Sequence, residues 1–128
     1  MNPPSEDVKD MITQSNGVGT FGTNVFIGAE PLIPDECVTI YDTGGFDPET
    51  HNDIFFPTVN IRVRGVMGGY KAAYAKALAI VTLLNGLRNE TWSATRYIQI
   101  FMVGDINTIG NDDSNRPLLT INFRIIRT

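Results

Sequence analysis

Apolar residues recur at helical spacing in two parts of the chain. Near the N-terminus, Val8, Met11 and Ile12 share one face and predict a short helix from about Ser5 to Gln14. Ser5 is suited to cap that helix, and Asn16-Gly17 is typical of the turn that follows one. A longer stripe begins at residue 70 and predicts a second helix ending near residue 87. Its members are Tyr70, Ala73, Tyr74, Ala77, Ile80, Val81, Leu84 and Leu87.

Elsewhere the pattern alternates with period two, which predicts β-strands. The clearest case is residues 57–64, where Val59, Ile61 and Val63 face one way. Asn60, Arg62 and Arg64 face the other way. Further strands are predicted at residues 24–27, 37–42, 97–103 and 118–126.

The order of these elements is helix, strand, strand, loop, strand, helix, strand, strand. It predicts an α+β fold, a mixed β-sheet with a short N-terminal helix and one long helix packed on one face. We expect residues 1–128 to form a single domain, since 128 residues suffice for one core and are few for two.

The segment Thr43–Phe55 breaks the alternation with glycines, a proline and acidic residues. We predict a long, exposed loop that is mobile in the free subunit and ordered by a neighbour. Aromatic residues in or beside such a loop are candidate anchors for a partner. The candidate contacts in this segment are Phe46, Asp47, Glu49, Asp53 and Phe55.

Charge and composition narrow the classes of function. Hydrophobic residues make up 42% of the chain and charged residues 19%, so it can bury a core. The net charge of −4 argues against gripping DNA or an anionic membrane through a basic surface. No apolar run is long enough to span a membrane. The single Cys37 rules out an intrachain disulfide, and the single His51 rules out a site with two imidazoles.

Two motifs invite a chemical interpretation. Gly65-Val66-Met67-Gly68-Gly69 lies between a strand and a helix, where backbone amides can bind phosphate. It lacks the lysine and hydroxyl residue of a P-loop, so a tight turn is favoured over a nucleotide site. The acids Asp105, Asp112 and Asp113 do not follow the EF-hand spacing and fit a polar turn between two strands. Cys37 has no basic neighbour in its apolar strand. We therefore predict no catalytic residue, cofactor or metal.

Three arginines could form a basic stripe on the polar side of the sheet. They are Arg62 and Arg64 on one strand and Arg124 on another. The stripe is either an ordinary solvated face or a surface that pairs with acids of a neighbouring copy.

Several segments together resemble the tail terminator proteins of long-tailed bacteriophages, also called minor capsid or tail-completion proteins. The resemblance spans nearly the whole chain. Its residues are Asn2–Asp10, Phe21–Gly28, Asn60–Arg64, Leu87–Trp92, Gly104–Ile106, Asn111–Pro117 and Ile121–Ile125.

The resemblance implies a structural virion protein rather than an enzyme. Such a subunit forms a ring, usually a hexamer, that caps the tail tube and offers a joining surface to the head connector. Double-stranded DNA passes through the lumen without specific binding, no membrane is involved, and assembly takes place in the host cytoplasm. Subunits of about 36 Å diameter leave a hole of about 25 Å in a pentamer and about 36 Å in a hexamer, enough for duplex DNA. The alternatives are a head-completion or neck adaptor ring and a small nucleotide-binding enzyme that uses residues 65–69.

Overall fold

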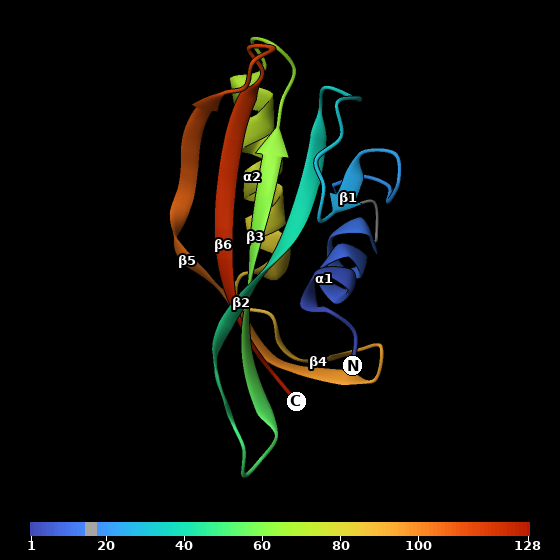
Figure 1. Ribbon diagram of the computed structural model, residues 1–128, viewed down its shortest axis with the longest axis vertical. Coiled ribbons are helices and arrows are strands. Elements are labelled where there is room, and N and C mark those ends of the chain that lie inside the picture. Colours follow the sequence, from blue (N-terminus) through green and yellow to red (C-terminus); the bar gives the residue numbers. More distant parts are fainter. Residues whose placement is uncertain (15–17) are drawn as a thin grey trace.

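Six strands and two helices make up the part of the chain that the computed structural model describes, residues 1–14 and 18–128 (Figure 1). The helices are α1 (Pro4–Thr13) and α2 (Tyr70–Leu84). The strands are β1 (Val25–Ile27), β2 (Cys37–Glu49), β3 (Ile54–Arg64), β4 (Arg88–Trp92), β5 (Thr95–Asn111) and β6 (Pro117–Arg127). They form one sheet in the order β1-β2-β3-β6-β5-β4. The β1–β2 pair is parallel and the other pairs are antiparallel, so the predicted α+β class with a mixed sheet is confirmed.

The core lies between one face of the sheet and the two helices. Val59, Ile61 and Val63 of β3 are fully buried, as the alternation predicted. Alternate residues of β6 extend this apolar surface, and both helices contribute to the same cluster. The buried face of α2 consists of Ala73, Ala77, Ile80 and Leu84. Its alanines let the helix backbone approach the sheet closely.

Leu84→Ala is expected to lower the free energy of unfolding by about 2–5 kcal/mol. The side chain is fully buried, so truncation loses apolar contacts and leaves a cavity. Leu83→Ala is the matched control, because Leu83 is 40% exposed on the same turn. Denaturant unfolding of the two variants measures the difference. Equal losses would show that α2 is not packed on the sheet by this face.

The segment predicted as a loop, Thr43–Phe55, is instead the distal half of a β-hairpin. β2 and β3 stay paired out to Glu49 and Ile54, which leaves only residues 50–53 for the turn. We call residues 43–57 the arm; its tip projects at the bottom of Figure 1. Two register shifts absorb the residues that break the alternation. Gly45 permits one of them: its φ is +138°, and a Cβ there would lie 2.2 Å from the carbonyl oxygen of Phe56.

Other boundaries also differ from the prediction. Residues 88–92 form an edge strand, β4, where the sequence analysis predicted neither a helix nor a strand. β5 continues to Asn111 through glycine bulges at Gly104 and Gly110, so the turn before β6 shrinks to residues 112–116. The second helix ends at Leu84 rather than near Leu87. The predicted helix stop at Asn16-Gly17 lies outside the described residues. Within the described ranges, no helix is long and apolar enough to cross a membrane.

Candidate assembly surfaces

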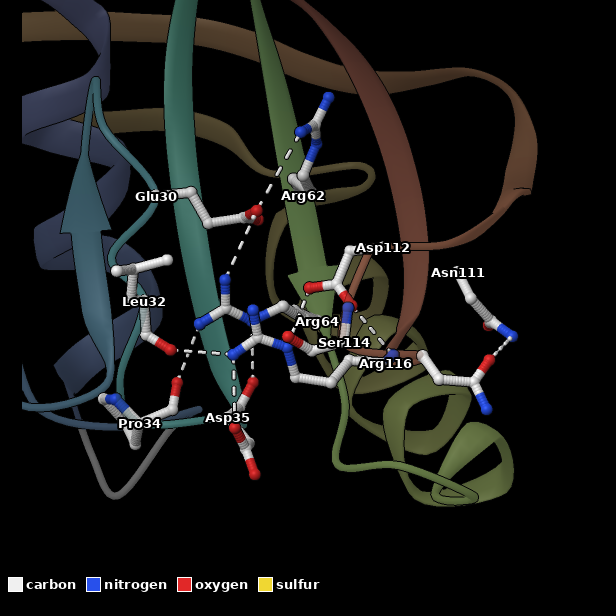
Figure 2. Close-up of polar contacts among 11 residues, drawn as sticks. Glu30, Leu32, Pro34, Asp35, Arg62, Arg64, Asn111, Asp112, Ser114 and Arg116 are labelled. Atoms are coloured by element: carbon white, nitrogen blue, oxygen red, sulfur yellow. Dashed lines mark hydrogen bonds and ion pairs between the residues drawn. The ribbon is translucent and has the colours of Figure 1, made fainter.

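Arg64 is buried within its own subunit, which excludes the solvated alternative for this residue. Its side chain is 2% exposed, and residues of the loop between β1 and β2 contact its guanidinium group (Figure 2). Its Nη1 lies 3.4 Å from a carboxylate oxygen of Glu30. Its Nε and Nη2 donate to the main-chain carbonyls of Asp35 and Pro34, each at 2.8 Å. Arg64 is thus a structural clamp on that loop.

A second buried arginine, Arg116, holds the same loop from the β5–β6 turn (Figure 2). It donates to the carbonyl of Leu32 at 2.7 Å and to the carboxylate of Asp35 at 3.1 Å. Its Nε donates to Asp112 at 2.7 Å. Burial alone would raise the pKa of Asp112, but hydrogen bonds from Arg116 outweigh it and lower that pKa below its ordinary value. The sequence analysis named Asp112 only as a turn residue and missed this role.

The face of the sheet away from the helices carries the other two arginines. Arg124 stacks between two aromatic rings, 4.2 Å from the centroid of Phe46 and 5.6 Å from that of Phe101. Arg62 lies over Tyr41 at 5.8 Å and reaches Glu30 at 4.0 Å. The predicted stripe is therefore split into one buried clamp and two arginines stacked on aromatic rings.

Beside Arg124 the surface is hollowed. This hollow has a volume of about 280 Å³ and is lined by Thr43, Phe46, Thr58, Val103, Asn122, Phe123 and Arg124. Phe46 is 56% exposed and Val103 is 44% exposed, so the hollow presents apolar surface to solvent. It lies where the arm, β6 and the bulged part of β5 meet.

The structure places the arm's acidic residues apart from the arginines. Asp47 and Asp53 are exposed, and Glu49 accepts hydrogen bonds from the His51 backbone and from Asn52. Among the described residues, the recorded ion pairs include none of these three acids. Phe55 is 36% exposed at the base of the turn. The arm is thus an acidic projection with two exposed aromatic rings.

The start of α1 is capped by a residue that is distant in sequence. The prediction that Ser5 is the N-cap is wrong: the helix begins at Pro4, with no side-chain cap hydrogen bond from Pro3. Instead Asp42 of β2 accepts hydrogen bonds from the backbone and hydroxyl of Ser5, at 2.9 Å and 2.6 Å. A carboxylate at a helix N-terminus is favourable because the free amides carry partial positive charge.

A buried polar cluster joins α1 to strands β5 and β6. Asp7 is fully buried and accepts a hydrogen bond from the Tyr97 hydroxyl of β5. Arg127 of β6 donates to the same hydroxyl at 3.2 Å and to the carbonyl of Asn2 at 2.8 Å. Burial, and next the hydrogen bond to Asp7, raise the pKa of Tyr97 above its ordinary value.

Tyr97 is expected to make stability fall at alkaline pH. The fold favours the neutral phenol, so its contribution is complete below the ordinary tyrosine pKa of about 10 and is lost as the pH rises through the folded-state value. The free energy of unfolding of the wild type should therefore approach that of Tyr97→Phe above pH 10, by up to about 1.4 kcal/mol per pH unit. Urea unfolding of the wild type and of Tyr97→Phe from pH 8 to 11 tests this. Tyr70→Phe is the control, because the Tyr70 side chain is 46% exposed. A constant difference across that range would contradict it.

The residues considered for catalysis serve packing or turns. Cys37 is fully buried, and burial raises the pKa of its thiol, which makes it a poor nucleophile. A Cβ on Gly65 would lie 2.9 Å from Cβ of Ala73, so this glycine permits close strand-to-helix packing, in keeping with a tight turn. Across residues 1–14 and 18–128, no three acidic, histidine or cysteine side chains gather as metal ligands would.

Comparison with known proteins identifies the family. A family model described as bacteriophage tail terminator protein matches residues 13–128, so the chain belongs to the tail terminator family. Members are structural proteins of the virion, in its tail or neck. The fold is similar to that of a chain from the virion of a native gene transfer agent particle, with a TM-score of 0.79 and 15% identity over 98% of this chain and 94% of that one. No curated protein matches the chain in sequence.

Proposed function

We propose that the chain forms a closed ring that caps the phage tail tube, ends tube polymerisation and joins the tail to the head connector. The family match over residues 13–128 carries this proposal. The diameter of the subunit allows a pentamer or a hexamer, and the family resemblance leads us to expect the hexamer. Double-stranded DNA passes through the lumen of the ring. It assembles in the host cytoplasm and acts as a structural part, without catalysis.

The need for such a ring follows from how tubes grow. A tube built from identical rings exposes the same binding surface after every addition, and such a heterologous contact continues without limit. A ring of a different protein stops growth if one of its faces accepts the tube and the other does not. Identical asymmetric subunits arranged head to tail produce a ring with two different faces.

The surfaces described above supply candidate contacts for this assembly. The arm presents Phe46, Asp47, Glu49, Asp53 and Phe55, and the outer sheet face presents Arg62 and Arg124. Exposed aromatic rings are suited to anchor a contact, and the charges are suited to set its register. Arg64 acts indirectly in this proposal, because it is buried and holds the β1–β2 loop.

Electron microscopy of particles made without this protein tests the proposal. We expect overgrown tubes and unattached heads, because nothing covers the growing tube end. Purified protein should stop further tube growth and restore joining without added nucleotide, and the heat-unfolded chain should do neither. Tails of normal length attached to heads would overturn the proposal. Tubes of normal length beside unattached heads would instead favour the neck adaptor.

A further inference from the structure

The two most exposed large apolar side chains of the described residues are neighbours on the β1–β2 loop. Leu32 is 81% exposed and Ile33 is 79% exposed. We call this pair the knob. Two large aliphatic side chains held together in solvent mark an interaction site more strongly than scattered ones do.

The backbone that carries the knob is held rigidly. The carbonyl of Leu32 accepts a hydrogen bond from Arg116, and the carbonyls of Pro34 and Asp35 accept from Arg64. Both arginines are buried, at 7% and 2% exposure, so these hydrogen bonds are shielded from water. Figure 2 shows the two guanidinium groups side by side, next to Leu32, Pro34 and Asp35 of the loop. Because the loop is already ordered, binding through the knob costs little conformational entropy.

The hollow beside Arg124 matches the knob in size and chemistry. At about 280 Å³ it lies just below the range of about 300–1,000 Å³ typical of small-molecule pockets, and it suits one or two inserted side chains. Phe46 and Val103, both exposed, supply its apolar lining. The knob and the hollow are different patches of one chain, so contact between them in two copies is head to tail, as a ring requires.

Charge supports the same pairing. Asp35 and Glu36 follow the knob, with side chains that are 58% and 45% exposed although each has an ion-pair partner within the chain. Arg124 borders the hollow, and the ion pairs recorded for residues 1–14 and 18–128 do not include it. In a head-to-tail contact between two copies, acids beside the knob would meet a cation beside the hollow, whereas knob-to-knob contact would bring acids together.

We propose that Leu32 and Ile33 of one subunit insert into the hollow between Phe46, Val103 and Arg124 of the next copy. This rests on the proposed ring, since it names the contact by which successive subunits meet.

The first test replaces both residues of the knob and measures how many joined particles form. Leu32→Ser with Ile33→Ser should lower the yield of joined head-and-tail particles that contain this protein by roughly tenfold or more, because the anchor of each contact is lost. Val66→Ser with Met67→Ser is the matched control, because this second adjacent pair is 43% and 65% exposed elsewhere on the chain. Both double variants should show the wild-type unfolding midpoint. A wild-type yield of joined particles containing the knob variant would overturn the proposal.

The second test maps the contact directly. The variants Ile33→Cys and Val103→Cys are made as two separate chains. They are produced together in cells infected by a phage that lacks the gene for this protein. A short bismaleimide should link the two variants in purified particles, and should link Ile33→Cys to Leu83→Cys far less. Linkage no greater than in that control would overturn the proposal. If particles still joined heads to tails of normal length, the capping function would stand while this contact failed. Particles with tubes of normal length in the complete absence of the protein would reject the capping function itself.

Discussion

Replacing Arg64 with alanine is expected to lower the free energy of unfolding by about 3–5 kcal/mol. The guanidinium is 2% exposed and compensates the carboxylate of Glu30, whose side chain is only 17% exposed. Its loss leaves that charge without its nearest partner and leaves the carbonyls of Pro34 and Asp35 without donors. Denaturant unfolding measures the loss, and hydrogen exchange of residues 30–36 should rise because the loop has lost one of its two clamps.

Arg62→Ala is the control for this experiment. Arg62 lies on the same strand and reaches the same Glu30, but at 4.0 Å and with a side chain that is 36% exposed. Such a solvent-screened pair is worth about 1 kcal/mol or less. Arg64→Lys should lose less than Arg64→Ala, because it keeps the charge but not the two hydrogen bonds to the loop backbone. A loss below about 1 kcal/mol for Arg64→Ala would contradict the role of a buried clamp.

Asp7→Ala is expected to cost about 3–4 kcal/mol. The carboxylate is fully buried and accepts a hydrogen bond from the Tyr97 hydroxyl. The same hydroxyl accepts a hydrogen bond from Arg127. Removing it leaves a buried hydroxyl without its acceptor and the buried charge of Arg127 without a nearby anion. The cost should therefore exceed that of an ordinary surface change in the same helix. Thermal or urea unfolding at neutral pH measures it.

Asp10→Ala in the same helix provides the comparison. Its carboxylate is 43% exposed and pairs with Lys9 at 3.0 Å, so its loss should stay within about 1 kcal/mol. Asp7→Asn should fall between the two, because the amide keeps an oxygen acceptor but not the charge. Similar losses for Asp7→Ala and Asp10→Ala would mean that the cluster does not join α1 to β5 and β6.

Local pattern determined the class of the fold. The period-two alternation of residues 57–64 placed Val59, Ile61 and Val63 on one face, and all three are buried in the core. The helical stripe placed Ile80 and Leu84 correctly for the same reason: a face that meets the core must be apolar at the period of its element. Length and composition predicted a single domain, and this stays a prediction. The family resemblance, later confirmed by the family match, also came from the sequence.

The arm shows where local pattern fails. Gly44, Gly45 and Pro48 have low strand propensity, so residues 43–55 were predicted to be a loop. In the structure the cross-strand ladder continues around them through two register shifts. Whether a segment joins a β-sheet depends on an available partner strand and on bulges that absorb a mismatch in register. Neither leaves a periodic pattern in the sequence.

The polar residues that hold the molecule together were likewise decided only by the tertiary structure. Arg64 alternated correctly with its strand but was placed in a surface stripe, and the β1–β2 loop buries it. Ser5 was predicted to cap its own helix and Asp7 was given no role, yet Asp42 and Tyr97 bind them across 37 and 90 positions of sequence. Periodicity predicts apolar burial because many residues of one helix or strand are buried together on the same face. A buried hydrogen bond depends on one particular partner, and the chain brings that partner near only when it has folded.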